Sequence, residues 1–314
     1  MIETVELAKR YRDSVALSDL SLTVRRAEVF GFLGPNGAGK TTAVKLLLGL
    51  ARATGGFGEV LGAPLGDRET RRRIGYLPEL FRYQDWLDAY EVLAFHARLI
   101  AIPRATRRSE IERVLAIVDL ASRARDRVGT YSKGMQQRLG LAVALLGSPA
   151  LVFLDEPTSA LDPLGRHDVR LLIEQLRENG TTVFLNSHLL TEVERICDRI
   201  AIVERGQIIA SGSVAELLGE DELVRLQLAC VDSAARDVLA RAGALREHGA
   251  QNASDPSWYR VPALQDIPQL VRNLVAEGVA IYAVEPQRAT LEQRFLELLT
   301  PEHSAVRNRI TDPS

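Results

Sequence analysis

The chain has 314 residues, which is long enough for two domains of ordinary size. Hydrophobic residues make up 46% of it and charged residues 25%, the balance of a globular rather than a disordered chain. The 39 Lys and Arg residues against 41 Asp and Glu residues leave a net charge of −2, which excludes a protein that coats nucleic acid through bulk positive charge.

The cysteine content and the hydropathy pattern exclude two further classes. Cys197 and Cys230 are too few for a disulfide framework or a cysteine-rich metal site, so we expect a reducing compartment. The N-terminus lacks the basic and apolar segments of a secretory signal. No uninterrupted apolar run reaches the roughly 18 residues that span a bilayer. We therefore expect a chain that does not cross a membrane by itself.

Short apolar runs alternate with helical patterns over the first 220 residues. They predict strands at 4–7, 20–24, 29–33, 74–78, 150–154, 181–185 and 200–203. Helical spacing predicts helices at about 40–50, at 87–117 with an interruption at Pro103, at 132–146 with Ser132 as N-cap, and at 169–176. The glycine-rich segment 55–58 is predicted to be a turn. The alternation predicts an α/β layer around a largely parallel sheet.

A second pattern begins near residue 220. Strands are expected at 222–228, 258–261 and 280–284, with a further one around Leu245, and helices at 234–241, 267–275 and 291–299. The resulting order βαββαβ is that of a small α+β, ferredoxin-like unit. We therefore expect one domain over 1–220, an accessory domain over 221–300, and a flexible polar tail over 301–314.

A phosphate-binding motif lies between the predicted buried strand and the helix that follows it. Its residues match G-x-x-x-x-G-K-[ST] without a departure: Gly34, Pro35, Asn36, Gly37, Ala38, Gly39, Lys40 and Thr41. The glycines let successive backbone N–H groups point into one anion-binding concavity, and the helix start adds its positive end. Lys40 reaches the β- and γ-phosphates, and the Thr41 hydroxyl can coordinate Mg²⁺. We predict that ATP or GTP binds here.

Two carboxylates follow the predicted strand at 150–154. Because ligands of open α/β sheets bind at the carboxyl ends of the strands, Asp155 is expected near the phosphate loop, where it would hold Mg²⁺ directly or through water. Adjacent strand residues point to opposite faces, so Glu156 is free to polarise an attacking water. Since the sequence shows no motif for an acceptor hydroxyl, we expect hydrolysis and not transfer of the phosphoryl group to a substrate.

Further motifs follow in a fixed order. They are Tyr131-Ser132-Lys133-Gly134-Met135-Gln136-Gln137-Arg138, Ser159-Ala160-Leu161-Asp162 and Asn186-Ser187-His188. With the phosphate loop and the acidic strand end, they make the chain resemble the ATP-binding subunits of ABC transporters over about residues 1–220. Lys133 and Met135 look like the variant signature of ABC-2 type exporters. The resemblance implies an ABC cassette of the P-loop NTPase class, with a mixed, largely parallel sheet and a helical subdomain at about 80–147.

The resemblance also implies roles for individual residues. Tyr11 would stack on adenine, and Thr42 would join the phosphate-loop contacts. Ser132, Lys133, Gly134 and Met135 would face the ATP that the other subunit of a head-to-tail dimer holds. A serine N-cap and free N–H groups at a helix start suit a phosphate.

Two more residues would complete the shared site. Asp162 would help to join the two subunits at their interface. His188 would contact the γ-phosphate and orient both the water and Glu156.

Three positions depart from the usual family pattern, and one of them is Met135, which stands where the signature has Gln. Glu79 stands where the family usually has Gln; its oxygen can still ligate Mg²⁺, and its charge should change how closure of the site is reported to the membrane partner. Lys133 replaces the first glycine of the signature. It either strengthens binding across the dimer or faces solvent, and the sequence leaves both open.

The sequence therefore predicts an ATPase that works as a pair, either of two copies or of one copy and a related ATP-binding subunit. The pair would hold two ATP molecules, each between residues 34–42 of one subunit and residues 132–135 of the other. Nucleotide binding would close the dimer and hydrolysis would open it, driving export through a separate membrane permease. The permease would dock on the helical block at 87–117. Arg104, Arg107 and Arg108 there are either part of that contact or a solvated face. We expect a cytoplasmic protein, peripheral on the inner face of the cell membrane, with ATP and Mg²⁺ as cofactors and no nucleic-acid partner.

Two other classes of protein fit this sequence less well. A soluble ABC ATPase acting on ribosomes or DNA would carry two cassettes or a long coiled coil, and this chain has one cassette and no sustained heptads. A P-loop kinase or GTPase would leave the signature at 132–135 unexplained. Cargo selection belongs to the membrane subunit, and the domain at 221–300 fits nucleotide-state regulation, dimer support or partner selection.

Overall fold

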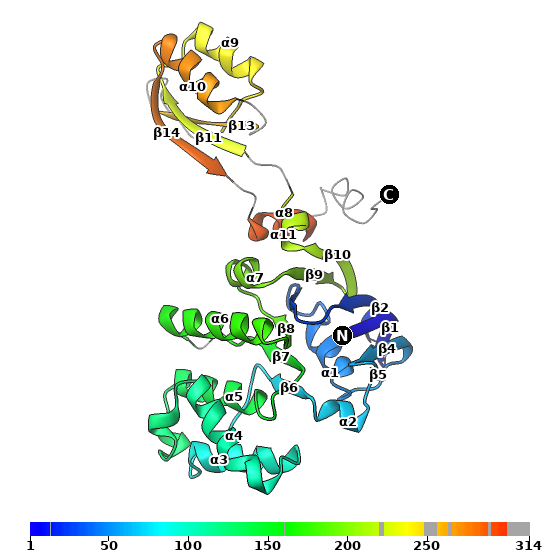
Figure 1. The fold of residues 1–314 in the computed structure, drawn as a ribbon. Helices are drawn as coiled ribbons and strands as arrows, with labels where there is room; N and C mark the ends of the chain where they lie inside the picture. Colours follow the sequence, from blue (N-terminus) through cyan, green and yellow to red (C-terminus); the bar gives the residue numbers. More distant parts are fainter. Residues whose placement is uncertain are drawn as a thin grey trace. The chain divides into compact units, whose positions relative to one another are not determined.

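The computed structural model describes residues 1–12, 14–159, 161–219, 223–247, 256–262, 266–287 and 290–299 (Figure 1). The chain forms two compact units, one mainly of Met1–Val214 and the other of Ala215–Leu296, and each is described by itself. In these described ranges, no helix is both long enough and apolar enough to cross a bilayer. The predicted tail at 301–314 lies outside them.

A single mixed sheet forms the centre of the first unit. Within its described residues the strand order is β5-β4-β1-β2-β10-β9-β3-β8-β7-β6. The bounds are β1 (Ile2–Tyr11), β2 (Ser14–Val24), β3 (Val29–Leu33), β4 (Gly55–Val60), β5 (Ala63–Pro64), β6 (Ile74–Leu77), β7 (Leu151–Asp155), β8 (Thr182–Asn186), β9 (Arg199–Glu204) and β10 (Gln207–Ser213). The strands β6, β7, β8, β3 and β9 run parallel, whereas β1, β2, β4 and β5 pair antiparallel. The prediction of a largely parallel sheet is confirmed.

Helices lie on this sheet and beside it (Figure 1). They are α1 (Lys40–Leu47), α2 (Arg68–Arg71), α3 (Ala89–Leu99), α4 (Arg104–Ile117), α5 (Lys133–Ala144), α6 (Pro163–Glu178) and α7 (Leu190–Ile196), with 3-10 turns at Ala121–Arg123 and Val128–Thr130. The helices α3, α4 and α5 pack on one another. The predicted break at Pro103 is confirmed, since Pro103 is the N-cap of α4. Ser132 is the N-cap of α5, as predicted, and its side chain accepts a hydrogen bond from the Met135 N–H.

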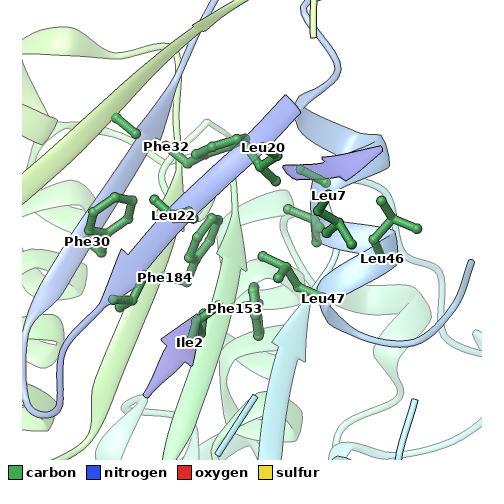
Figure 2. Packing of buried hydrophobic residues seen from close by; sticks show 14 of the residues in the cluster. Ile2, Leu7, Leu20, Leu22, Phe30, Phe32, Leu46, Leu47, Phe153 and Phe184 are labelled. Atoms are coloured by element: carbon green, nitrogen blue, oxygen red, sulfur yellow. The ribbon is translucent and has the colours of Figure 1, made fainter. Parts of the chain in front are cut away.

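Four phenylalanine side chains from three neighbouring parallel strands pack against one another (Figure 2). The ring centroid of Phe184 on β8 lies 5.8 Å from that of Phe30 and 5.4 Å from that of Phe32, both on β3. It lies 5.0 Å from the ring centroid of Phe153 on β7. All four side chains are fully buried, and each aromatic pair contributes about 0.5–1.5 kcal/mol beyond the burial of its area. This packing holds the ends of β3, β7 and β8 at fixed positions.

The prediction of a turn at 55–58 is wrong, because these residues begin the edge strand β4, which pairs with β1. The pairing is irregular between Val5 and Ala8, and Gly56 has φ +73° at that point. A Cβ on Gly56 would lie 2.1 Å from the Glu6 carbonyl oxygen. The glycine therefore permits close approach of two strands at a bulge, which sequence alone does not distinguish from a turn.

Two helix predictions had the wrong extent. The helix expected at 40–50 ends at Leu47, because Gly49 turns into the left-handed region at φ +66°. The helix expected at 169–176 begins six residues earlier, at Pro163, because the Asp162 side chain caps it and proline suits the first turn.

The second unit is an open-faced α+β fold. Its elements are α8 (Val214–Leu218), β11 (Leu223–Ala229), α9 (Ser233–Arg241), β12 (Leu245–Arg246), β13 (Ser257–Pro262), α10 (Ile267–Ala276), β14 (Ala280–Gln287) and α11 (Leu291–Leu299). The strands pair antiparallel in the order β12-β13-β11-β14, and α9 and α10 lie together on one face (Figure 1). The βαββαβ order predicted for a ferredoxin-like unit is confirmed. Residues 220–222, of which Glu222 begins the strand predicted at 222–228, lie outside the described residues.

Candidate nucleotide site

The phosphate loop joins the end of β3 to the start of α1. Gly39 is the N-cap of α1 with φ 103°, and no side chain caps this helix start. The N–H groups of its first turn are therefore left for an anion. A Cβ on Gly39 would lie 2.5 Å from the Ala16 carbonyl oxygen, and one on Gly34 would lie 2.2 Å from the Val203 carbonyl oxygen. Backbone packed this closely on both sides requires glycine at these two positions.

A cavity of about 560 Å³ opens over this loop, a size that suits a small-molecule ligand. It brings the loop together with residues from β2, β6, β7 and β8 and from the segments that follow them. The lining residues are Ser14, Val15, Ala16, Asn36, Gly37, Gly39, Lys40, Thr41, Thr42, Glu79, Asp155, Glu156, Asn186 and His188. The structure thus gathers the predicted phosphate, metal and catalytic residues at one place.

Asp155 ends strand β7 and is only 4% exposed. Its Oδ1 accepts a hydrogen bond of 2.5 Å from Nδ2 of Asn186, which lies beside it in register on β8. Burial raises the pKa of Asp155, whereas the hydrogen bond from Asn186 lowers the pKa. The nearby carboxylates of Glu79 and Glu156 raise the pKa further. Because its ionised form is disfavoured in this environment, the Asp155 carboxylate would be stabilised by a bound cation.

Glu156 does not continue strand β7. Its φ is +54°, in the left-handed region, so the expected alternation of neighbouring strand residues ends at Asp155. Oε1 accepts a hydrogen bond from the His188 backbone N–H (2.9 Å), and Nδ1 of His188 lies 2.8 Å from the same oxygen. Oε2 is buried and has no hydrogen-bond partner among the described residues. The turn therefore fixes one carboxylate oxygen and leaves the other free to accept a proton.

Lys40 folds over the loop that precedes it. Its Nζ donates to the carbonyl oxygens of Gly34 (2.6 Å) and Pro35 (3.2 Å). Burial lowers the pKa of Lys40, although Glu156, Asp155 and Glu79 all raise it. One ammonium thus faces three carboxylates in the cavity, and this excess of negative charge would oppose a triphosphate unless a cation accompanied it.

The residues of the signature segment lie outside this cavity. Ser132 and Lys133 are exposed, at the N-terminal end of α5. Gly134 lies close to the loop before α6, since a Cβ there would be 3.4 Å from Cδ2 of Leu161. Asp162 accepts a hydrogen bond of 2.7 Å from the Gly165 N–H as the N-cap of α6. The structure therefore brings the signature and Leu161-Asp162 together, away from their own chain's phosphate loop.

Tyr11 also lies outside the residues that line the cavity. It is 46% exposed, and it pairs in register with Ser14, which does line the cavity. Nζ of Lys9 lies 4.7 Å from its ring centroid. Stacking of Tyr11 on adenine remains a prediction.

Sequence reasoning missed two polar residues of this region. Asn186 was noted as part of Asn186-Ser187-His188, but no role was assigned to its side chain; its position at a strand end was the available signal. Gln137 was noted only as part of the signature, yet it is 5% exposed and donates to the carbonyl oxygens of Glu156 and Pro157. No local pattern in the sequence indicated that contact.

The strand order, the glycine-rich phosphate loop and the acid-bearing strand beside it define the class of protein: a nucleotide-hydrolysing cassette of the P-loop type. Residues 17–159 match the protein family described as ABC transporter. An uncharacterized ABC transporter ATP-binding protein of Synechocystis sp. is 41% identical over 311 residues, covering 95% of this chain and 84% of that protein. The daunorubicin resistance ATP-binding protein DrrA3 of Streptomyces coeruleorubidus is 37% identical, covering 92% and 93%.

Solved structures agree with these relatives. A structure described as the ATP-binding subunit of an ABC transporter has a TM-score of 0.64 at 29% identity, and the match covers 69% of this chain and 91% of that one. The chain belongs to the ATP-binding proteins of ABC transporters. The alternative of a soluble ABC ATPase acting on ribosomes or DNA is not favoured.

Proposed function

We propose that this protein is the ATP-hydrolysing subunit of an ABC-2 type exporter, in which two copies enclose two ATP molecules. One observation carries the proposal. The cavity is lined by residues of the phosphate loop and by Glu156, whereas Ser132–Met135 do not line it, and Ser132 and Lys133 are exposed at a helix start. Each site is therefore completed by the signature segment of a second copy or of a related ATP-binding subunit.

The chain's own residues would bind the triphosphate in the cavity. The N–H groups of Gly37, Gly39 and the first turn of α1 surround the phosphates, and Lys40 exchanges its two carbonyl partners for phosphate oxygens. Tyr11 supplies a stacking surface for the base next to the cavity wall at Ser14.

Hydrolysis would depend on the placement of Glu156. Its free Oε2 accepts the proton of the attacking water, while His188 holds Oε1 and so fixes the orientation of the carboxylate. His188 is 63% exposed at its side chain, so its Nε2 side can reach a γ-phosphate. General-base catalysis of this kind contributes about 10²–10⁴-fold in rate.

The oxygen donors of the cavity fit Mg²⁺. Among the described residues no three His, Cys, Asp or Glu side chains form a complete metal-ligand set. Mg²⁺ does not need one, because it is usually held by one or two carboxylates together with waters and phosphates. Asp155, Glu79 and the Thr41 hydroxyl would hold it, and the ion would neutralise phosphate charge.

Coupling to a membrane permease would use the surface next to Glu79. Large apolar side chains are exposed there and along α3, with Leu80 at 87%, Trp86 at 71%, Phe95 at 56% and Leu99 at 63% exposure. Exposed apolar side chains of this size mark protein contacts. The export direction is supported by a relative whose name contains it, the Nod factor export ATP-binding protein I of Cupriavidus pinatubonensis, which is 36% identical over 220 residues.

The test uses two variants of the full-length protein. Glu156→Gln should lower kcat at least about 100-fold, retain ATP binding and accumulate an ATP-bound dimer in size-exclusion chromatography. Ser132→Arg should abolish turnover while a single copy still binds ATP. Glu194→Gln, a carboxylate outside the cavity, is the matched control. Continued turnover by Glu156→Gln, or a rate per molecule that does not depend on protein concentration, would overturn the proposal.

A further inference from the structure

A buried glutamine connects the signature helix to the turn that carries the proposed catalytic carboxylate. Gln137 lies on α5, is 5% exposed, and its Nε2 donates to the carbonyl oxygen of Pro157 (3.0 Å) and, at 3.4 Å, to that of Glu156. Both partners are acceptors only, so the amide must present its NH₂ group to them. The orientation of the Gln137 side chain is therefore fixed by chemistry.

The backbone that Gln137 holds is in an uncommon conformation. Glu156 has φ +54°, which is unfavourable for a residue with a side chain and persists where surrounding contacts enforce it. Its N–H donates to the carbonyl oxygen of Asn186 (2.9 Å). Its own carbonyl oxygen accepts from the Ser159 hydroxyl (3.1 Å) as well as from Gln137. Strand β8 thus holds one side of the turn and helix α5 the other.

The same helix begins at the signature. Gln137 follows Ser132 by five residues, or about 7.5 Å along a continuous helix. A shift of the start of α5 is therefore transmitted to the Glu156–Pro157 backbone through a side chain that is buried on a well-packed helix.

We infer that Gln137 is a positioning residue that sets the placement of the Glu156 carboxylate in its own chain according to the position of the signature helix. The inference rests on the proposed function, in which Ser132 contacts the nucleotide of the second copy. Gln137 then links each chain's Glu156 to the state of the neighbouring site. Both side-chain hydrogen bonds that Gln137 makes among the described residues go to backbone oxygens, and Gln137 is not among the residues that line the cavity.

The first test compares Gln137→Leu with Gln136→Leu in the full-length protein. Leucine at 137 keeps much of the volume but donates no hydrogen bond, whereas Gln136 is the half-buried neighbour on the same helix. Gln137→Leu should lower kcat at least about tenfold, since misplacement by 1 Å can cost about 100-fold. KM and ATP affinity should stay within about twofold, and the ATP-bound dimer should accumulate. Gln136→Leu should change none of these.

A double-mutant comparison separates positioning from a purely structural role. If Gln137 acts through Glu156, then Gln137→Leu added to Glu156→Gln should not lower the residual rate further. A purely structural role would instead lower the melting temperature and multiply the two losses in rate.

The failures are distinguishable. Turnover retained in Glu156→Gln would contradict the proposed function and this inference together. Turnover lost in Glu156→Gln but normal in Gln137→Leu, or fully multiplicative losses in the double variant, would overturn the inference alone.

Discussion

An added methyl group at Gly34 tests whether the shape of the phosphate loop depends on its packing against the sheet. A Cβ there would lie 2.2 Å from the Val203 carbonyl oxygen on β9, the strand that runs parallel to β3. Unbonded heavy atoms need about 3.5 Å, so the loop must move by about 1 Å. Overpacking of this kind costs about 1–3 kcal/mol, because the contacting atom is backbone and cannot rotate away.

The displacement should weaken ATP binding and also lower stability. Gly34→Ala should raise the dissociation constant for ATP about 10–100-fold, since each tenfold corresponds to about 1.4 kcal/mol. The melting temperature should fall by about 2–4 °C for each kcal/mol. Titration with a fluorescent ATP analogue and thermal denaturation measure the two effects separately.

Two glycines with open surroundings are the controls. Gly180 lies in the turn after α6 with φ +84°, Gly37 lies in the phosphate loop with φ +81°, and a Cβ on either would meet no atom within 4 Å. Gly180→Ala should cost about 1–2 kcal/mol of stability and leave ATP affinity unchanged. Gly37→Ala should weaken ATP less than Gly34→Ala does. If Gly34→Ala bound ATP as tightly as Gly180→Ala, the packing argument would be refuted.

Three further predictions concern charge and burial. Asp155→Asn should raise the melting temperature at neutral pH and weaken Mg²⁺-dependent ATP binding. Burial raises the pKa of Asp155, so the wild-type carboxyl takes up its proton, and the gain in melting temperature disappears, as the pH falls through that raised pKa. A series of melting curves at different pH values measures this change. Glu79→Gln removes one of three carboxylates facing Lys40 and should tighten ATP binding in EDTA a few-fold; weaker binding would contradict the electrostatic account. Thiol titration of the native protein should label Cys230, which is exposed, but not Cys197, because burial leaves it 7% exposed and raises the pKa of its thiol; both should react in denaturant.

The sequence predicted best where a motif is local. The phosphate loop needs only residues 34–41 and the strand and helix around them, so its position between β3 and α1 could be predicted directly. Ser132 could likewise be identified as an N-cap, because capping depends on neighbours within one turn. In the second unit, regular alternation along the strands was enough for the βαββαβ order.

Prediction failed where strand pairing is irregular. The first half of β2 was missed because its buried residues Leu17 and Leu20 are three apart, which breaks the period of two. The cause lies in the partner strand: Lys9 pairs with Leu17 and Leu7 with Leu20, with shifts of register between them. A bulge in one strand thus disturbs the hydrophobic pattern of the other, and only the pairing reveals it.

The contacts that shape the catalytic turn depend on strand order, which the hydrophobic pattern does not encode. Asp155 meets Asn186 because β7 and β8 are neighbours, although 31 residues separate them. Gln137 meets Pro157 because α5 packs against β6, the neighbour of β7 in the sheet. Glu156 breaks the expected alternation at the point where these contacts converge, and a local rule broken under such constraint is typical of functional sites. Nine other described non-glycine residues also have positive φ, so Glu156 is distinguished by the contacts that converge on its turn and not by φ alone.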